Sequence, residues 1–197
     1  MYFPMFINIP KEGEVLLIGG GMVAFHKLSK LKEFDIKVHL IAKRVDLSFY
    51  NYSQADKLEI EEREFSDSDL DRDYIFVIAA TDDRELNKHI SDLCQKKRIP
   101  VNVVDDAQLS SFIFPSFVKN DSVVAAVSSG GRVPVVTQYL RDRLKAEIPE
   151  NMGEIISQLE AYRLELVDSV QDHKERAALI RKRLEELIQL EGDSFGD

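Results

Sequence analysis

In the first half of the chain, short apolar runs alternate with amphipathic stretches of helical period. The apolar runs are rich in valine and isoleucine and show little polar alternation, which is typical of strands buried on both faces of a parallel sheet. This alternation predicts a Rossmann-like α/β fold, a doubly wound parallel sheet with helices on both faces. The predicted strands are residues 14–20, 36–42, 58–65, 74–81 and 100–105, and the predicted helices are residues 22–34 and 83–98.

The pattern changes after Asp106. Residues 112–129 predict two strands joined by a turn at 119–121, and residues 138–148 predict a helix. From Asn151 onward the chain is helical, and Asn151 and Glu154 have the spacing of a capping box. A second helix in this part is predicted to begin with capping by Asp172 and Glu175 and to end near Leu190. The buried stripe of the first helix is predicted to consist of Ile155, Leu159, Tyr162, Leu166 and Val170.

Composition limits the class of protein. The chain has 197 residues, 44% of them hydrophobic, and a formal net charge of −9. An acidic chain argues against a general nucleic-acid binder, because phosphate neutralisation needs a basic surface. No apolar run approaches the roughly 20 residues of a membrane span, and the N-terminus has neither a basic region nor a small-residue cleavage site. We therefore expect a cytoplasmic protein without a membrane partner.

Sulfur and imidazole groups do not suggest a metal or redox centre. The single cysteine, Cys94, excludes an intramolecular disulfide, and its helical context favours a packing role over a nucleophilic one. The four histidines lack metal-ligand spacing, so we expect surface or helix residues and no metal site. They are His26, His39, His89 and His173.

A run of three glycines separates the first predicted strand from the first predicted helix. The pattern Gly19-x-Gly21-x-x-Ala24 in this context fits a dinucleotide fingerprint, in which glycines let the backbone approach a pyrophosphate at a helix N-terminus. A tight turn without a ligand fits the same residues. The candidate cofactor-binding residues here are Gly19, Gly20, Gly21, Met22 and Val23.

The end of the second predicted strand lacks the acidic residue that usually binds the adenosine ribose. Ala42, Lys43 and Arg44 stand there instead. Two cations at this point could tolerate a 2′-phosphate, so the sequence does not separate NAD from NADP. Solvated loop charges are an equally good interpretation of Lys43 and Arg44.

Six motifs in order, YFPMFINI, IGGGMVA, VIAATDD, NVVDD, FIFPS and AVSSGG, resemble the precorrin-2 dehydrogenase family of siroheme biosynthesis. The resemblance runs from Tyr2 to about Pro149 and includes the N-terminal module of siroheme synthase. It implies an NAD-dependent homodimer that oxidises precorrin-2 to sirohydrochlorin. It further implies an NAD-binding Rossmann-like domain at 1–113, a dimerisation region at 114–148 and a helical domain at 149–197.

The resemblance also implies roles for individual residues. Asp105, in the family's NVVD motif, is implied to be the catalytic acid–base, although a turn-capping role fits any Asp-Asp pair that follows a strand. Thr81 is implied to lie beside the cofactor as a hydrogen-bond donor, and a helix cap is the other interpretation. Ser128, Ser129 and Gly130 are implied to bind a substrate carboxylate where the SSGG segment opens a helix, and an ordinary helix cap fits equally well.

The sequence departs from the family pattern at two positions, and it leaves two alternative functions open. His26 stands where an arginine is usual, and Val133 stands where a serine is common. Some family members also insert iron, and the same aspartate could take protons from the pyrrole nitrogens, so a bifunctional dehydrogenase and ferrochelatase is one alternative. A non-catalytic nucleotide-sensing regulator is the other, but it would need neither Asp105 nor the SSGG segment.

Overall fold

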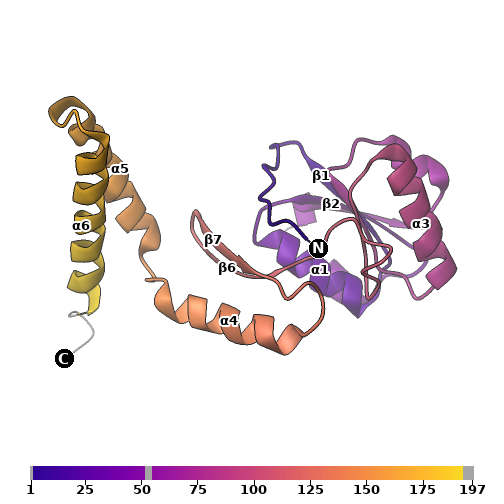
Figure 1. Ribbon diagram of the computed structural model, residues 1–197. Coiled ribbons are helices and arrows are strands. Elements are labelled where there is room, and N and C mark those ends of the chain that lie inside the picture. The colour runs from indigo at the N-terminus through magenta and orange to yellow at the C-terminus, as the bar shows by residue number, and fades with distance from the viewer. Residues whose placement is uncertain (1, 52–54, 193–197) are drawn as a thin grey trace. The chain divides into compact units, whose positions relative to one another are not determined.

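The computed structural model describes residues 2–51 and 55–192 (Figure 1). The chain divides into two compact units, Met1–Phe114 and Pro115–Asp197. The first unit carries a five-stranded sheet, and the second carries a two-stranded sheet and three long helices.

The five-stranded sheet is parallel throughout, with the strand order β3-β2-β1-β4-β5. Ile18, the last residue of the first strand, lies beside Ile41 and Ala79, so the carboxyl ends of the central strands meet at one edge. All five predicted strands are present, although each is shorter than predicted. They are β1 (Glu14–Ile18), β2 (Lys37–Ala42), β3 (Leu58–Glu62), β4 (Phe76–Ala79) and β5 (Val101–Val103).

Helices cover both faces of this sheet, because the side chains of each central strand alternate between two apolar cores. On one face, Val15 and Leu17 pack with Leu28 of α1 (Met22–Lys32). On the other face, Leu16 packs with Ile90 of α3 (Arg84–Lys97). Figure 1 shows the two helices flanking the sheet. The prediction of a Rossmann-like doubly wound sheet is therefore confirmed.

The segment between β2 and β3 contains a four-residue helix, α2 (Leu47–Tyr50), that the sequence did not predict. Asp46 caps it by accepting a hydrogen bond from the Ser48 N–H at 2.9 Å, and Phe49 is buried in the core on the α1 side. Two short 3₁₀ turns, Ala55–Lys57 and Asp67–Asp71, complete this unit.

In the second unit, β6 (Ser116–Asn120) and β7 (Val123–Val127) form the predicted antiparallel hairpin. The helix α4 (Pro134–Glu147) contacts both strands and begins earlier than predicted, with Pro134 in its first turn. Proline is favoured there because its missing N–H has no partner within a helix. The helices α5 (Met152–Ser169) and α6 (His173–Gly192) contact each other.

The caps of the two C-terminal helices only partly follow the prediction. Asn151 is at the N-cap of α5 but makes no side-chain capping hydrogen bond there, so the predicted capping box is wrong. Asp172 caps α6 as predicted, because its carboxylate accepts from the Lys174 N–H at 2.6 Å. The predicted stripe of α5 faces inward, with Ile155 and Leu166 buried. None of the helices within residues 2–51 and 55–192 combines the length and apolar character needed to cross a bilayer.

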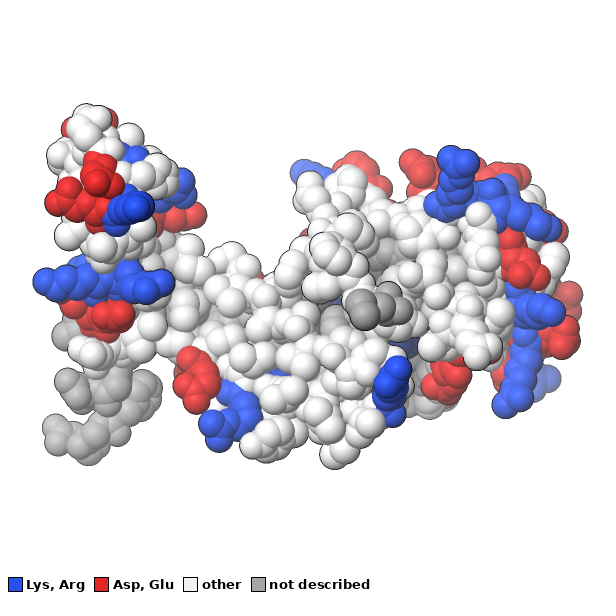
Figure 2. All heavy atoms as spheres, in the orientation of Figure 1, with Lys and Arg blue, Asp and Glu red and all other residues white. Residues whose placement is uncertain are grey.

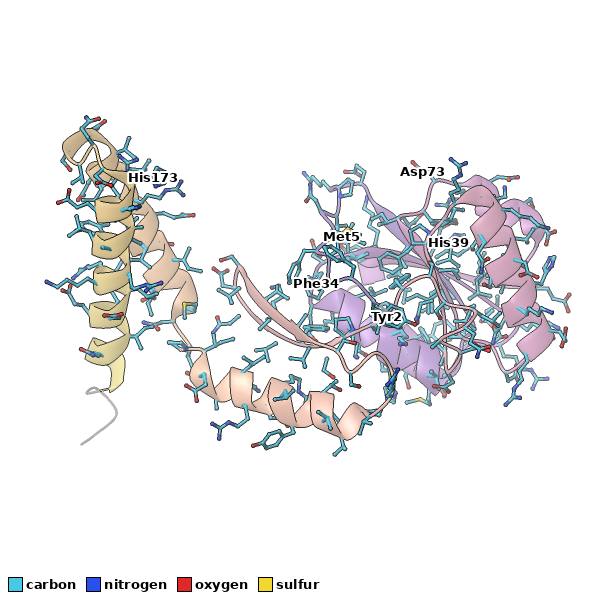
Figure 3. The ribbon with its side chains drawn as sticks, in the orientation of Figure 1. Tyr2, Met5, Phe34, His39, Asp73 and His173 are labelled. Atoms are coloured by element: carbon cyan, nitrogen blue, oxygen red, sulfur yellow. The ribbon has the colours of Figure 1, made fainter. Side chains whose placement is uncertain are left out.

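The expectation for histidines is wrong at position 39. His39 is on the internal strand β2 and is 1% exposed, within the sheet of the first unit (Figure 3). Its Nε2 lies 2.8 Å from Glu61 and its Nδ1 lies 2.7 Å from the Tyr74 hydroxyl. Arg72, which can only donate, is 3.2 Å from Nδ1. We therefore assign Nδ1 as the acceptor and Nε2–H as the donor to Glu61.

His39, Glu59 and Glu61 offer ligand atoms within 4.8 Å of one another. Both carboxylates already face arginines. Arg63 Nε donates to Glu61 at 2.6 Å, and Arg72 lies 3.5 Å from Glu59. Because a cation would have to displace these guanidinium contacts, the cluster is better described as an ion-pair network around a buried histidine.

Candidate active site

A cavity of about 1080 Å³ opens at the carboxyl ends of the strands in the first unit. This edge of an open parallel sheet is where ligands bind, at the point where the strand order reverses between β1 and β4. The volume suits a ligand of dinucleotide size. The cavity is lined by all the predicted cofactor-binding residues and by the predicted catalytic aspartate, which are Gly19, Gly20, Gly21, Met22, Val23, Lys43, Arg44, Thr81 and Asp105.

The backbone surroundings differ among the three glycines. Gly19 has φ +114°, and a Cβ there would lie 2.3 Å from the carbonyl oxygen of Ala80. A Cβ at Gly20 would lie 2.2 Å from the carbonyl oxygen of Arg44, whereas a Cβ at Gly21 would meet no atom within 4 Å. The first two glycines therefore allow the loop to pack against neighbouring backbone, and the third leaves open space in the cavity wall.

The N-terminus of α1 faces this cavity without a side-chain cap. Gly21 is the N-cap residue and can supply no capping oxygen, and the first turn has no acidic residue. Met22 and Val23, the first two helical residues, line the cavity and are about half exposed. The first N–H groups of a helix have no intrahelical partner and lie at the positive end of the helix dipole. This helix start is therefore suited to bind a pyrophosphate.

Thr81 lines the cavity, but its hydroxyl is used within the protein. It donates to Asn87 Oδ1 at 2.7 Å, and Asn87 Nδ2 donates back to the Thr81 carbonyl at 3.0 Å. The cap of α3 is Asp83, whose carboxylate accepts from the Leu86 N–H at 3.0 Å. Sequence reasoning missed Asn87; the available signal was a polar residue on the buried face of α3. The contact of Thr81 with a cofactor stays a prediction.

The two aspartates that follow β5 have different environments. Asp106 Oδ1 accepts hydrogen bonds from the N–H groups of Gln108 at 2.9 Å and Leu109 at 3.1 Å, so Asp106 is the turn-capping residue. Asp105 lines the cavity, is exposed, and has a left-handed backbone with φ 61°. Its carboxylate makes no hydrogen bond or ion pair with the residues that the structure describes. Left-handed backbone at a non-glycine residue is uncommon and is enriched at functional sites.

A lysine near Asp105 was not singled out from the sequence. Lys27 of α1 is half-buried, and its Nζ lies 4.5 Å from the ring centre of Phe114. Burial lowers the pKa of Lys27, the positive charge of Lys30 lowers it further, and the negative charge of Asp105 opposes both. The charge of Asp105 is thus felt at Lys27. The signal in the sequence was a lysine directly before Leu28, on the buried face of the predicted helix 22–34.

The predicted substrate-binding serines lie in the second unit. Ser128 Oγ accepts a hydrogen bond from the Gly130 N–H at 3.0 Å, and Ser129 Oγ accepts from the Val133 N–H at 3.2 Å. The expectation that SSGG itself opens the helix is wrong, because a turn with φ 67° at Gly130 lies between the serines and Pro134, where α4 begins. Binding of a substrate carboxylate by Ser128, Ser129 and Gly130 stays a prediction.

Charged side chains are mixed in sign over the described surface that Figure 2 draws. Along the right-hand edge of the first unit, lysine and arginine lie among aspartate and glutamate and do not form a basic stripe, and most of the face turned to the viewer is uncharged. Several of them form exposed ion pairs, such as Lys97 with Asp71 at 2.6 Å and Lys37 with Glu12 at 2.5 Å. The expectation that the chain does not bind nucleic acid stays a prediction.

Comparison with known proteins gives the class first. Residues 6–116 match the family described as "Putative NAD(P)-binding", and the chain belongs to this family. This confirms the prediction that the glycine loop is part of a dinucleotide-binding domain.

The particular relatives are siroheme synthases. The chain is 36% identical over 184 residues to the siroheme synthase of Thioalkalivibrio sulfidiphilus, covering 93% of this chain and 37% of that protein. It is 38% identical over 192 residues to that of Nitrosospira multiformis, covering 95% of this chain and 39% of that protein. The chain therefore spans less than two fifths of the length of these curated relatives.

A solved structure has the same fold. It is named "SirC, precorrin-2 dehydrogenase" and aligns with a TM-score of 0.67 at 18% identity, covering 96% of this chain and 98% of that chain. The fold similarity includes the helical C-terminal part. The sequence comparison thus confirms the resemblance to siroheme synthase that the motifs indicated, and the solved structure confirms the fold.

Proposed function

We propose that this chain is an NAD-dependent precorrin-2 dehydrogenase, which oxidises precorrin-2 to sirohydrochlorin in siroheme biosynthesis. The carboxylate of Asp105 carries the proposal, because it makes no hydrogen bond or ion pair with the described residues and lines the same cavity as the glycine loop. The names of the similar proteins support the same reaction.

The residues of the cavity suit a dinucleotide. The open space at Gly21 and the uncapped start of α1 leave room and N–H groups for the pyrophosphate. In a sheet of this strand order the adenosine end lies over β2 and the nicotinamide end lies toward β4 and β5. A bound nicotinamide supplies the acceptor for a hydride. This orientation brings that acceptor to the side of the cavity where Asp105 lies.

Asp105 is proposed to act as the base. Dehydrogenation of precorrin-2 removes a hydride and a proton, and an ionised carboxylate at the cavity wall can accept that proton on an Oδ atom. Because Asp106 already caps the turn, Asp105 is not required for that task. Lys27 lies close enough to Asp105 for the charges of the two side chains to interact.

We also propose that the chain acts as a homodimer through residues 114–148. Thr137 is the one buried residue in 115–148, so the hairpin β6–β7 and α4 have no buried apolar side chain of their own. A two-stranded sheet is marginally stable without a larger core. The exposed large apolar side chains of α4 are suited to an interface with a second copy, and they are Val135, Val136, Tyr139 and Leu140.

The test is to incubate the purified protein with precorrin-2 and NAD and to follow NADH absorbance. We expect NADH to form in proportion to the precorrin-2 consumed. NAD binding without turnover would contradict the proposal and favour the nucleotide-sensing alternative.

For the ferrochelatase alternative, Fe²⁺ or Co²⁺ is then added to the product. Metal insertion above the rate without protein would add the ferrochelatase activity, for which the unpaired Asp105 carboxylate is also suited as a proton acceptor.

A further inference from the structure

Apart from Asp46, the charged residues that line the cavity are separated by sign. Three basic residues, Lys43, Arg44 and Arg63, line the side formed by β2 and β3. The carboxylates of Asp82 and Asp83, which follow β4, and of Asp105, which follows β5, belong to the opposite side. In the proposed orientation the basic side receives the adenosine end of the dinucleotide. Its charges therefore bear on the substituents of the adenosine ribose.

Two of the three cations are already paired within the protein. Lys43 Nζ lies 3.0 Å from Glu64 Oε1. Arg63 makes two hydrogen bonds of 2.8 Å to the carboxylate of Asp69 and one of 2.6 Å to Glu61. These contacts raise the pKa of Arg63 and hold its guanidinium in a bidentate pair. Neither cation is the one best placed to take up a new anion.

Arg44 differs from both. It is exposed, and its side chain makes no hydrogen bond or ion pair with any residue that the structure describes. The backbone of Arg44 packs closely against Gly20, since a Cβ added at Gly20 would lie only 2.2 Å from the Arg44 carbonyl oxygen. The N–H of Asp46, two residues later, donates to the Gly20 carbonyl at 2.8 Å. Arg44 thus has a backbone packed on the glycine loop and a guanidinium without a partner among the described residues.

The carboxylate that would select against a 2′-phosphate is missing. An acidic residue at the end of β2 would accept a hydrogen bond from the ribose 2′-hydroxyl and repel a phosphate there. The strand ends at Ala42 and is followed by two cations. The first acidic residue after it, Asp46, accepts from the N–H and the hydroxyl of Ser48 at 2.9 and 2.5 Å. Its carboxylate is therefore committed to capping α2.

We propose that this cavity accepts dinucleotides phosphorylated on the adenosine 2′-hydroxyl as well as unphosphorylated ones, and that Arg44 determines this specificity. The inference rests on the proposed dinucleotide binding and extends it from NAD to NADP. A guanidinium can donate two parallel hydrogen bonds to a phosphate, which a lysine paired with Glu64 cannot match. The unphosphorylated ribose has no charge for Arg44 to bind.

Calorimetric titration of the full chain with NAD and with NADP tests the proposal. The informative variant is Arg44→Gln, and the matched control is Lys96→Gln, which removes the same charge from an exposed position near the far end of α3. We expect the wild-type protein to bind NAD and NADP with affinities that lie within about tenfold of each other. Arg44→Gln should weaken NADP binding by about tenfold, the effect of losing one charge-assisted hydrogen-bonded pair, with NAD binding changed by less than about twofold.

Adenosine 2′,5′-bisphosphate and 5′-AMP repeat the comparison on the adenosine end alone. Arg44→Gln should weaken only the bisphosphate, and Lys96→Gln should weaken neither. If the wild-type protein bound NAD but bound NADP more than about a hundredfold more weakly, this inference would be overturned and the proposed function would stand. Equal losses for both cofactors in Arg44→Gln would also overturn it. If neither dinucleotide bound the wild-type protein, the proposed function would fail as well.

Discussion

Asp105 and Asp106 are adjacent in the chain, but only Asp106 is hydrogen-bonded to the turn that follows β5. The carboxylate of Asp106 accepts from two N–H groups, at 2.9 and 3.1 Å. Asp105, with its left-handed backbone, lines the cavity at the carboxyl ends of the strands. The pair therefore separates a structural carboxylate from one that is available to a ligand.

Replacing these two carboxylates in turn should give opposite results. Asp105→Asn keeps the size of the side chain and removes its basicity, so we expect NADH formation to fall by about a hundredfold or more with an unchanged melting temperature. Asp106→Ala should lower the free energy of unfolding by about 1 kcal/mol through the loss of the cap and retain turnover. The measurements are NADH absorbance with precorrin-2 and a thermal melt. Turnover like the wild type in Asp105→Asn would remove Asp105 from the chemistry.

The glycine loop allows a similar pair of variants. Gly21→Val adds a side chain where no atom lies within 4 Å, so the protein should fold while the pyrophosphate loses its space. Gly20→Val places a Cβ within 2.2 Å of the Arg44 carbonyl and should destabilise the fold. Calorimetry with NAD and a melting curve distinguish the two. Unchanged NAD affinity in a folded Gly21→Val protein would place the phosphate site elsewhere.

The proposed homodimer predicts a concentration-dependent mass. Sedimentation at micromolar concentration should give twice the mass of the chain, and Val135→Glu should shift it toward the monomer, because Val135 is an exposed apolar residue of α4. Lys145→Glu, near the charged end of the same helix, is the control and should stay dimeric. A monomeric wild type would contradict the proposal.

The alkaline stability of the first unit should depend on Tyr74. Burial raises the pKa of Tyr74 to about 12, above the value near 10 of an unfolded chain. The folded state therefore favours the neutral phenol, and the stability from this group is complete below about pH 10 and is lost as the pH rises toward 12. Tyr74→Phe cannot ionise, so its free energy of unfolding should fall less over this range. Urea denaturation at a series of pH values measures the free energy of unfolding of both proteins. If the two free energies fell in parallel with rising pH, the prediction would be contradicted.

The sheet could be predicted because its strands are buried on both faces. Val15 to Ile18 are all 2% exposed or less, so the sequence shows a continuous apolar run that no surface segment would carry. The four-residue helix α2 could not be predicted, because it is too short for a period to be visible. The failed cap at Asn151 has the residue types of a capping box, and only the local backbone decides whether its hydrogen bonds form.

The site was predictable in its residue types and less so in its contacts. Asp105 and Asp106 form one Asp-Asp pair in the sequence, and only the backbone angle of Asp105 distinguishes their roles. His39 was misread because its partners, Glu61 and Tyr74, come from other parts of the chain. The pairing of Lys43 with Glu64 likewise joins residues on separate strand ends.

The close packing of the glycine loop has a consequence for the rates of cofactor exchange. The Gly19 N–H donates to Ile41 at 2.9 Å and the Gly20 carbonyl accepts from Asp46, so the loop is tied to the neighbouring strand before any ligand arrives. A preorganised loop loses little conformational entropy on binding. We therefore expect association without a slow rearrangement, and a residence time for the reduced dinucleotide that depends on its direct contacts and not on reopening of the loop.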